Sequence, residues 1–286
     1  MRRRIFRIGL LIGSMLLASG LVAGIAVIVV GIIHQGDSAL AAPQSVMPMR
    51  EAMDRVRAFA EDSKLDLSGG LSPAIPGDDS RPVYWFESGA GTTVDEFKVD
   101  GLSGEVLEAT FRSRLIRTTP DRRTTMEQAA VIASGFASRR FDGFNKLTLI
   151  ERSSLPAQDV GAIHSIKWVL VDESTRAELP TSVTVGVTGT DGRVVRYIAQ
   201  RDPLKIDTKP TISADQASSA ALSEVAADRD WRSATVSSRR LQVIYDEVDH
   251  QRLAWAVALD APNTTPSPMR LLIFVDARSG EIIELN

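Results

Sequence analysis

The sequence predicts an α+β protein in which an N-terminal transmembrane helix is followed by three tandem repeats, each a helix plus an antiparallel sheet. The phrase D-G-L-S-G-E-V-L at residues 100–107 returns as D-A-R-S-G-E-I-I at residues 276–283, and Gly192 lies 88 residues from the equivalent glycine of each copy. A helix-capping sequence occurs twice at the same spacing, and residues 8–33 carry no charge. Landmarks that recur at a fixed spacing indicate a structural repeat.

The composition excludes several classes of protein. A hydrophobic content of 44% and a charged content of 24% are typical of chains with ordinary buried cores. Four of the 33 basic residues precede the uncharged run, which leaves 29 basic and 36 acidic residues in the acidic remainder. This balance argues against a nucleic-acid binder. The absence of cysteine from the sequence excludes disulfides, thiol catalysis, cysteine-ligated zinc and a lipid-modified N-terminal cysteine.

The N-terminal region is predicted to be a membrane anchor. A basic cytoplasmic tail at residues 1–7 precedes the run 8–33, which at about 1.5 Å per residue is long enough to cross about 30 Å of hydrocarbon. The arginines place the N-terminus in the cytoplasm and residues 34–286 outside, as a single-pass protein of the cell membrane. A signal peptide cleaved near Ala39-Leu40-Ala41 is the alternative. Its apolar region is normally only about 7–15 residues long, so we favour an uncleaved signal-anchor.

Five glycines of this run fall on one face of the predicted helix. Small residues at such spacing let two membrane helices approach closely, which suggests self-association or pairing with another membrane protein. Glycine is also common in membrane helices for no such reason. The residues are Gly9, Gly13, Gly20, Gly24 and Gly31.

The first and second repeats are predicted at residues 45–111 and 124–201, after a connector at residues 34–44. Helical spacing of apolar residues over 45–64 gives way to strand-like alternation at 83–87, 94–99 and 105–111. In the second repeat, Thr125 to Gln128 forms a capping box that begins a helix. Its strands are expected at 147–151, 166–171, 182–187 and 194–199.

The third repeat is predicted at residues 211–286, after a linker at 202–210. Its capping box, Ser213 to Gln216, follows that of the second repeat by 88 residues. Strands are expected at 241–245, 253–259, 271–276 and 281–285. One tryptophan per repeat is predicted to pack in the core against the helix, namely Trp85, Trp168 and Trp255.

The linker at residues 112–123 is rich in arginine. Such a cluster suits an anionic polymer or lipid headgroups, but a solvated linker explains it more simply. The residues are Arg112, Arg114, Arg117, Arg122 and Arg123.

The repeated phrase has the composition of a turn between two strands. Its Asp carboxylate is expected to accept hydrogen bonds from turn N–H groups, and its Gly to take the left-handed conformation. The competing hypothesis makes Asp100 and Asp276 metal ligands or catalytic carboxylates.

Residues 45–286 resemble tandem PepSY domains of bacterial envelope proteins. The resemblance is carried by V-D-G-L-S-G-E-V at 99–106 and V-D-A-R-S-G-E-I at 275–282, whereas the middle copy departs with Thr188 and Arg193. The resemblance implies a small α+β domain, found in metallopeptidase propeptides and in secreted or membrane-anchored proteins, which binds or restrains peptidases. It supplies no catalytic residues.

No hydrolase, zinc-protease or phosphate-loop motif occurs in the sequence. The densest cluster of possible metal ligands is Asp246 to His250, and the pair Asp78 and Asp79 is weaker. The other histidines are His34 and His164. Because a charged hairpin tip explains the cluster, we predict no catalytic residue, cofactor or metal.

The favoured hypothesis is a non-enzymatic interaction module that binds or regulates an envelope peptidase or cell-wall hydrolase through its edge strands. A metal-assisted hydrolase using residues 246–250 and a structural spacer in the cell envelope are the alternatives. Function is expected on the surfaces between the repeated copies.

Overall fold

The structure is a computed structural model that describes residues 45–72, 81–115, 123–157, 161–228, 231–246, 250–261 and 270–283. Residues Gln44–Asn286 form one compact unit. The predicted anchor at 8–33, with its five glycines, and the basic tail at 1–7 lie outside the described residues. Among the helices that are described, none is both long and apolar enough to cross a membrane.

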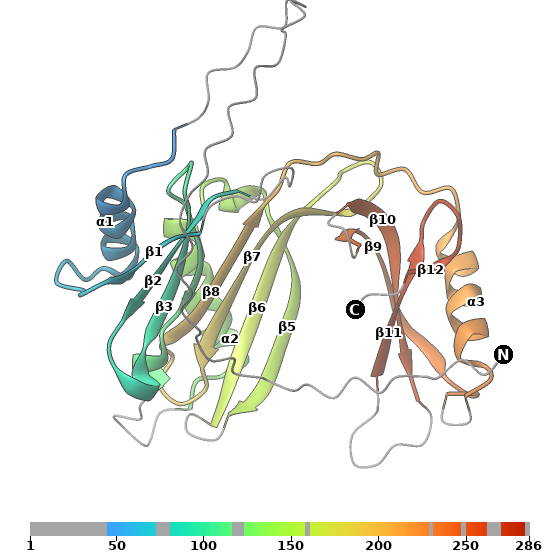
Figure 1. Cartoon of the computed structure of the whole chain (residues 1–286). Helices are drawn as coiled ribbons and strands as arrows, with labels where there is room; N and C mark the ends of the chain where they lie inside the picture. The colour runs from blue at the N-terminus through green and yellow to red at the C-terminus, as the bar shows by residue number, and fades with distance from the viewer. Residues whose placement is uncertain are drawn as a thin grey trace, which may run out of the picture. The chain divides into compact units, whose positions relative to one another are not determined.

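Three helices each precede a set of antiparallel strands (Figure 1). The first set is α1 (Met49–Ala60), β1 (Ser68–Ser72), β2 (Val83–Ser88), β3 (Asp95–Asp100) and β4 (Val106–Thr110). The second is α2 (Met126–Arg140), β5 (Thr148–Ala157), β6 (Gly161–Val171), β7 (Glu178–Thr188) and β8 (Val194–Arg201). The third is α3 (Ala214–Val225), β9 (Thr235–Tyr245), β10 (Gln251–Asp260), β11 (Arg270–Asp276) and β12 (Ile282–Ile283).

The predicted fold class is wrong. The described chain is mostly β-structure, with twelve strands and three α-helices, and the strands belong to one sheet rather than to three separate ones. The main path of the sheet is β1-β2-β3-β4-β8-β7-β9-β10-β11-β12, with β6 and then β5 branching from β7. The physical reason is that a strand edge left open by one set of strands is satisfied by pairing with another set.

The second and third helices begin at the predicted capping boxes. The Thr125 hydroxyl accepts a hydrogen bond from the N–H of Gln128, and the side-chain oxygen of Gln128 accepts one from the N–H of Thr125. Ser213 and Gln216 repeat the arrangement. Helix α1 begins after Pro48 without a side-chain cap.

The pairing of β4 with β8 has a local two-fold symmetry. Glu108 pairs with Ile198, Ala109 with Tyr197 and Thr110 with Arg196. The three β8 residues follow the three β4 residues by 88 positions, so each pair maps onto another when the copies are exchanged. Two equivalent edges thus meet as in an isologous interface, about an axis at Ala109 and Tyr197.

One hydrophobic core extends across this junction and includes residues from α1, α2 and the strands between β2 and β8. The Tyr197 ring lies 5.0 Å from that of Phe59 on α1 and 5.9 Å from that of Phe136 on α2. The small Ala109 opposite Tyr197 leaves room for this ring at the axis.

The third set of strands joins the sheet through little backbone pairing. Strand β9 meets β7 in parallel only at Gln242 and Glu178, and α3 packs over a separate core. The Glu178 carboxylate is buried and lies 3.3 Å from Arg240 on β9. Burial raises the pKa of Glu178 despite the nearby Arg240.

The tryptophan prediction is wrong for Trp85, whose side chain is 47% exposed and lies beneath Lys98. Each set of strands has one inward-pointing residue that pairs with a valine at the same place in the repeat. These valines, Val99, Val187 and Val275, are 88 residues apart in the sequence. Each inward side chain contacts a backbone carbonyl just before a helix. These side chains are Tyr84 on Met47, His164 on Thr124 and Trp255 on Ile212.

The Tyr197 hydroxyl is buried and has no hydrogen-bond partner among the described residues. Because its removal gives up no hydrogen bond, Tyr197→Phe is expected to leave the free energy of unfolding unchanged or to raise it by up to about 1 kcal/mol. The control Tyr84→Phe removes a hydroxyl that donates to Met47 and should cost about 0.5–1.5 kcal/mol. Urea unfolding measures both, and a larger loss for Tyr197→Phe would contradict the packing described.

Candidate functional site

The repeated turn uses its Asp for the backbone, as predicted. Asp100 Oδ1 accepts the N–H groups of Leu102 and Ser103, both at 2.8 Å. Asp276 Oδ1 accepts those of Arg278 at 2.8 Å and Ser279 at 2.9 Å. The glycines Gly104, Gly192 and Gly280 all have left-handed φ angles, of 73°, 72° and 81°.

Two variants of this turn replace its characteristic residues. In the β7–β8 turn, the Thr188 hydroxyl accepts the N–H of Arg193 at 2.9 Å. In the β6–β7 turn, Asp172 accepts the N–H groups of Ser174 and Thr175. There Arg176 takes the left-handed position with a φ of 61°. The turn geometry therefore tolerates several side chains, which favours a structural role for its Asp.

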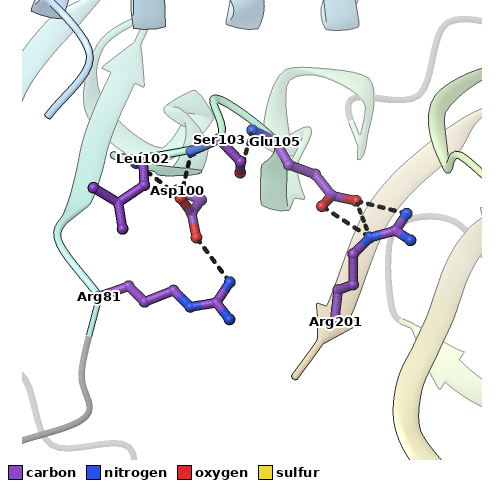
Figure 2. A network of polar contacts seen from close by, with 6 residues as sticks. All are labelled: Arg81, Asp100, Leu102, Ser103, Glu105 and Arg201. Carbon is purple, nitrogen blue, oxygen red and sulfur yellow. Dashed lines mark hydrogen bonds and ion pairs between the residues drawn. The ribbon is translucent and has the colours of Figure 1, made fainter. Parts of the chain in front are cut away.

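Electrostatics also fit a structural role for Asp100. Burial pushes the pKa of Asp100 upward, but the N–H groups of Ser103 and Leu102 and the guanidinium of Arg81 outweigh it and lower the pKa. The Arg81 guanidinium lies 3.4 Å from the carboxylate (Figure 2). Asp100 is thus held ionised with its oxygens already occupied.

Glu105, the residue after the turn glycine, links the β3–β4 turn to β8. Arg201 at the end of β8 binds both carboxylate oxygens of Glu105 at 3.1–3.3 Å (Figure 2). The same guanidinium donates to the carbonyl of Asp142 at 2.9 Å and lies 4.0 Å from the centroid of the Phe141 ring. One side chain therefore joins the β3–β4 turn to the end of α2 across the β4–β8 junction.

Two cavities share this ion pair in their walls. The larger, about 760 Å³, is lined by Arg55, Phe59 and Glu61 from the α1 end and by Arg140 from the α2 end. The smaller, about 340 Å³, is lined by residues that include Arg81, Asp100 and Asp202. The junction between the first two sets of strands therefore presents polar and charged groups.

A third cavity, about 460 Å³, lies between α2 and the β5–β6 strands. It is lined by Ala130 and Val131 of α2, Leu149 of β5 and Trp168 of β6. Glu127 and Arg152 add one charge of each sign. Strand β5 pairs only with β6 in the described sheet, so its other edge is open beside this apolar groove.

The candidate cluster of metal ligands at Asp246 to His250 is not assembled among the described residues. The N–H of His250 donates to Asp246 Oδ1 at 3.0 Å, and the N–H of Asp246 donates to the carbonyl of His250 at 3.0 Å. The intervening residues 247–249, like Asp78, Asp79 and His34, lie outside the described part. Within that part, no three His, Asp or Glu side chains are placed to hold a metal ion.

The arginine-rich linker contributes internal contacts. Arg112 lies 2.8 Å from Glu96, and Arg114 donates to the carbonyl of Val194 at 3.2 Å while stacking on Phe111. Arg117 and Arg122 are outside the described residues. Sequence reasoning missed Arg140 and Arg201, for which the only signal was the expectation of function between the copies. It also missed Val131, whose groove lies within the second set of elements and had no such signal.

Comparisons with known proteins give similarity to solved structures only. No family model and no curated protein matches the chain. The Bacillus megaterium YpeB C-terminal domain is 18% identical, covers 84% of this chain and 97% of its own, and has a TM-score of 0.49. A putative lipoprotein (CD1622) from Clostridium difficile 630 is 16% identical, covers 55% of this chain and 97% of its own, and has a TM-score of 0.19. Because both TM-scores are below 0.5, neither likeness bears on function.

Asp276 is expected to contribute stability that depends on pH. Burial pushes its pKa upward, but the N–H groups of Ser279 and Arg278 and the charge of Arg252 lower it overall. Asp276→Ala should cost about 1–3 kcal/mol at pH 7 because it leaves these donors unsatisfied, and Asp276→Asn should cost less. A lowered pKa in the folded state makes this contribution complete above the unfolded pKa of about 3.9 and lost as pH falls through the folded pKa.

Urea unfolding at pH 7 and below pH 4 measures this contribution. The difference between the natural protein and Asp276→Asn should shrink at the lower pH. The exposed Asp54, paired only with Arg57 on the same helix, supplies the control Asp54→Asn. A difference for Asp276→Asn that is independent of pH would contradict the assignment.

Arg176 and Gly280 test the conformational part of the turn. Arg176→Gly should raise the free energy of unfolding by about 0.5–1 kcal/mol, because glycine adopts the left-handed conformation without a Cβ clash. Gly280→Ala should lower it by about 1 kcal/mol through conformation alone, since the nearest atom to the new Cβ is 3.8 Å away. Thermal or urea unfolding that shifts both variants in one direction would refute this account.

Proposed function

We propose that this chain is a non-enzymatic protein-binding module that takes up an extended segment of a partner protein along the open edge of β5. The observation that carries the proposal is the position of this edge beside the apolar groove under α2. Backbone pairing supplies affinity in this mode of recognition, and a pocket for alternate side chains supplies specificity.

The usable part of the β5 edge is short and bounded. The register with β6 shifts between Leu149 and Glu151, and Pro156 lacks an N–H. Between these points, residues 151–155 can pair with an added strand. The bulge and the proline limit open-ended pairing between copies of the chain, which is how natural edge strands avoid aggregation. The edge therefore accepts one short segment.

The groove is suited to an apolar side chain of that segment. Leu149 and Trp168 form its floor from the sheet, and Val131 on α2 is 74% exposed above it. Arg152 pairs with the position of the buried Ile166 and so projects to the α2 side of the sheet. An apolar residue flanked by a polar or acidic one fits this combination of surfaces.

The proposal extends to the cellular location of the protein and to the class of its partner. The resemblance of the turn sequences to PepSY domains supports an extracytoplasmic place in the cell envelope. The same resemblance supports an envelope peptidase or cell-wall hydrolase as the partner that is bound or restrained.

A peptide selection tests the binding site. Random ten-residue peptides displayed on phage are panned on the purified full-length protein, and the selected peptide is assayed by hydrogen exchange. We expect protection of the backbone amides at residues 151–155. Val131→Asp should weaken binding at least about ten-fold, since burial of such a side chain is worth about 1.5–3 kcal/mol.

The matched control is Leu272→Asp, which changes another exposed apolar side chain, 45% accessible, on β11. It should leave the affinity unchanged. Protection elsewhere in the chain, or equal effects of the two variants, would reject the β5 site. The partner class is tested by comparing proteins that co-purify with the natural chain and with Val131→Asp. A peptidase or hydrolase retained equally by both would not be bound at this groove.

A further inference from the structure

The larger junction cavity contains an arginine whose hydrogen-bonding capacity is only partly used. The Arg140 side chain is 8% exposed, donates from Nε to the carbonyl of Phe59 at 3.0 Å, and stacks 3.8 Å from the Phe136 ring centroid. Its Nη2 donates to Glu61 at 2.7 Å. Its Nη1 is buried and has no hydrogen-bond partner within the described structure. A guanidinium fork normally binds a carboxylate with two nitrogens, so this one is half occupied.

Glu61, which occupies the fork, is placed unusually. It terminates α1 in the left-handed conformation, with φ 58° and ψ 33°, a position where glycine is the common residue. Its side chain is 67% exposed, and one of its carboxylate oxygens accepts the hydrogen bond from Arg140. The hydrogen bond and charge of Arg140 lower the pKa of Glu61, so the carboxylate stays ionised. An exposed carboxylate in a strained backbone position is a weak occupant.

The cavity around this pair has further guanidinium groups in its wall. Arg201 is neutralised by Glu105, and Arg55 makes a long contact of 3.4 Å with Glu51. Arg139 makes no ion pair among the described residues and lines the same cavity. When Glu61 leaves, the basic side chains of the wall outnumber Glu105 and Asp142. The carbonyl groups at the end of α1 would repel a bound anion only weakly, because the carbonyl of Phe59 already accepts a hydrogen bond from Arg140.

We propose that this cavity is a carboxylate-binding site, in which Glu61 is an internal occupant that an acidic side chain of a bound peptide replaces. The incoming carboxylate binds Nη1 and Nη2 of Arg140 together and so satisfies the nitrogen that Glu61 leaves unpaired. The site is separate from the β5 groove, at the opposite end of α2, and its function does not depend on strand addition.

The test is calorimetric titration of the full-length protein with an acetylated and amidated hexaglutamate peptide. Glu61→Gln keeps the size of the side chain but removes the competing charge, so it should bind the peptide several-fold more tightly than the natural protein. Arg140→Lys keeps the charge but loses the fork, so it should weaken binding at least about ten-fold. Glu224→Gln, which removes an exposed acidic residue from α3 instead, should change nothing.

Two further arms decide the source of the carboxylate and the role of Glu61. A hexaglutamine peptide with a free C-terminus, bound by the natural protein and lost in Arg140→Lys, would assign the site to a chain terminus. Equal binding by the natural protein and Glu61→Gln, or no binding by either, would overturn the proposal. Because Glu61 is exposed, its variant folds independently of the buried Arg140, and a failure of Arg140→Lys to fold leaves this comparison intact.

Discussion

The antiparallel pairing of β4 with β8 is the interaction on which the architecture of the first two sets of strands depends. It satisfies two equivalent strand edges at once and brings α1 and α2 over one core centred on Phe59, Phe136 and Tyr197. It also places the β3–β4 turn against the end of α2, where Arg201 joins them. The charged cavities of the junction exist only because these edges meet.

The repeated acidic sequence stabilises the backbone of the turns in this fold. Asp100 and Asp276 each hold a turn by accepting hydrogen bonds from two backbone N–H groups, and the Thr188 hydroxyl accepts one in the same way. The residues that carry the functional proposals are less conspicuous. Val131 and Arg140 stand near opposite ends of α2 and give it two chemically distinct surfaces, one apolar beside an open strand and one cationic. The repeated motif therefore identifies the structural scaffold, whereas the proposed binding surfaces differ between the repeated copies.

The predictability of each feature followed the range of the interaction behind it. Capping boxes at Thr125 and Ser213 and the left-handed glycines depend on contacts within a few residues, so the local sequence predicted them. Trp85 failed because alternate strand residues point to opposite faces, and a one-residue difference in register puts Tyr84 inside and Trp85 outside. The sites were not predictable, because Arg140 and Glu61 are 79 residues apart in the sequence.

By itself, the sequence determined where helices begin, how the turns close, and that their landmarks recur every 88 residues. Tertiary structure alone decided that the described strands share one sheet, that β5 keeps an open edge among them, and that Arg140 meets Glu61. The physical reason is that hydrogen-bonding groups on a strand edge are the same in every strand. Which edges pair is settled by long-range packing and shape, which alternation of polar and apolar residues does not encode.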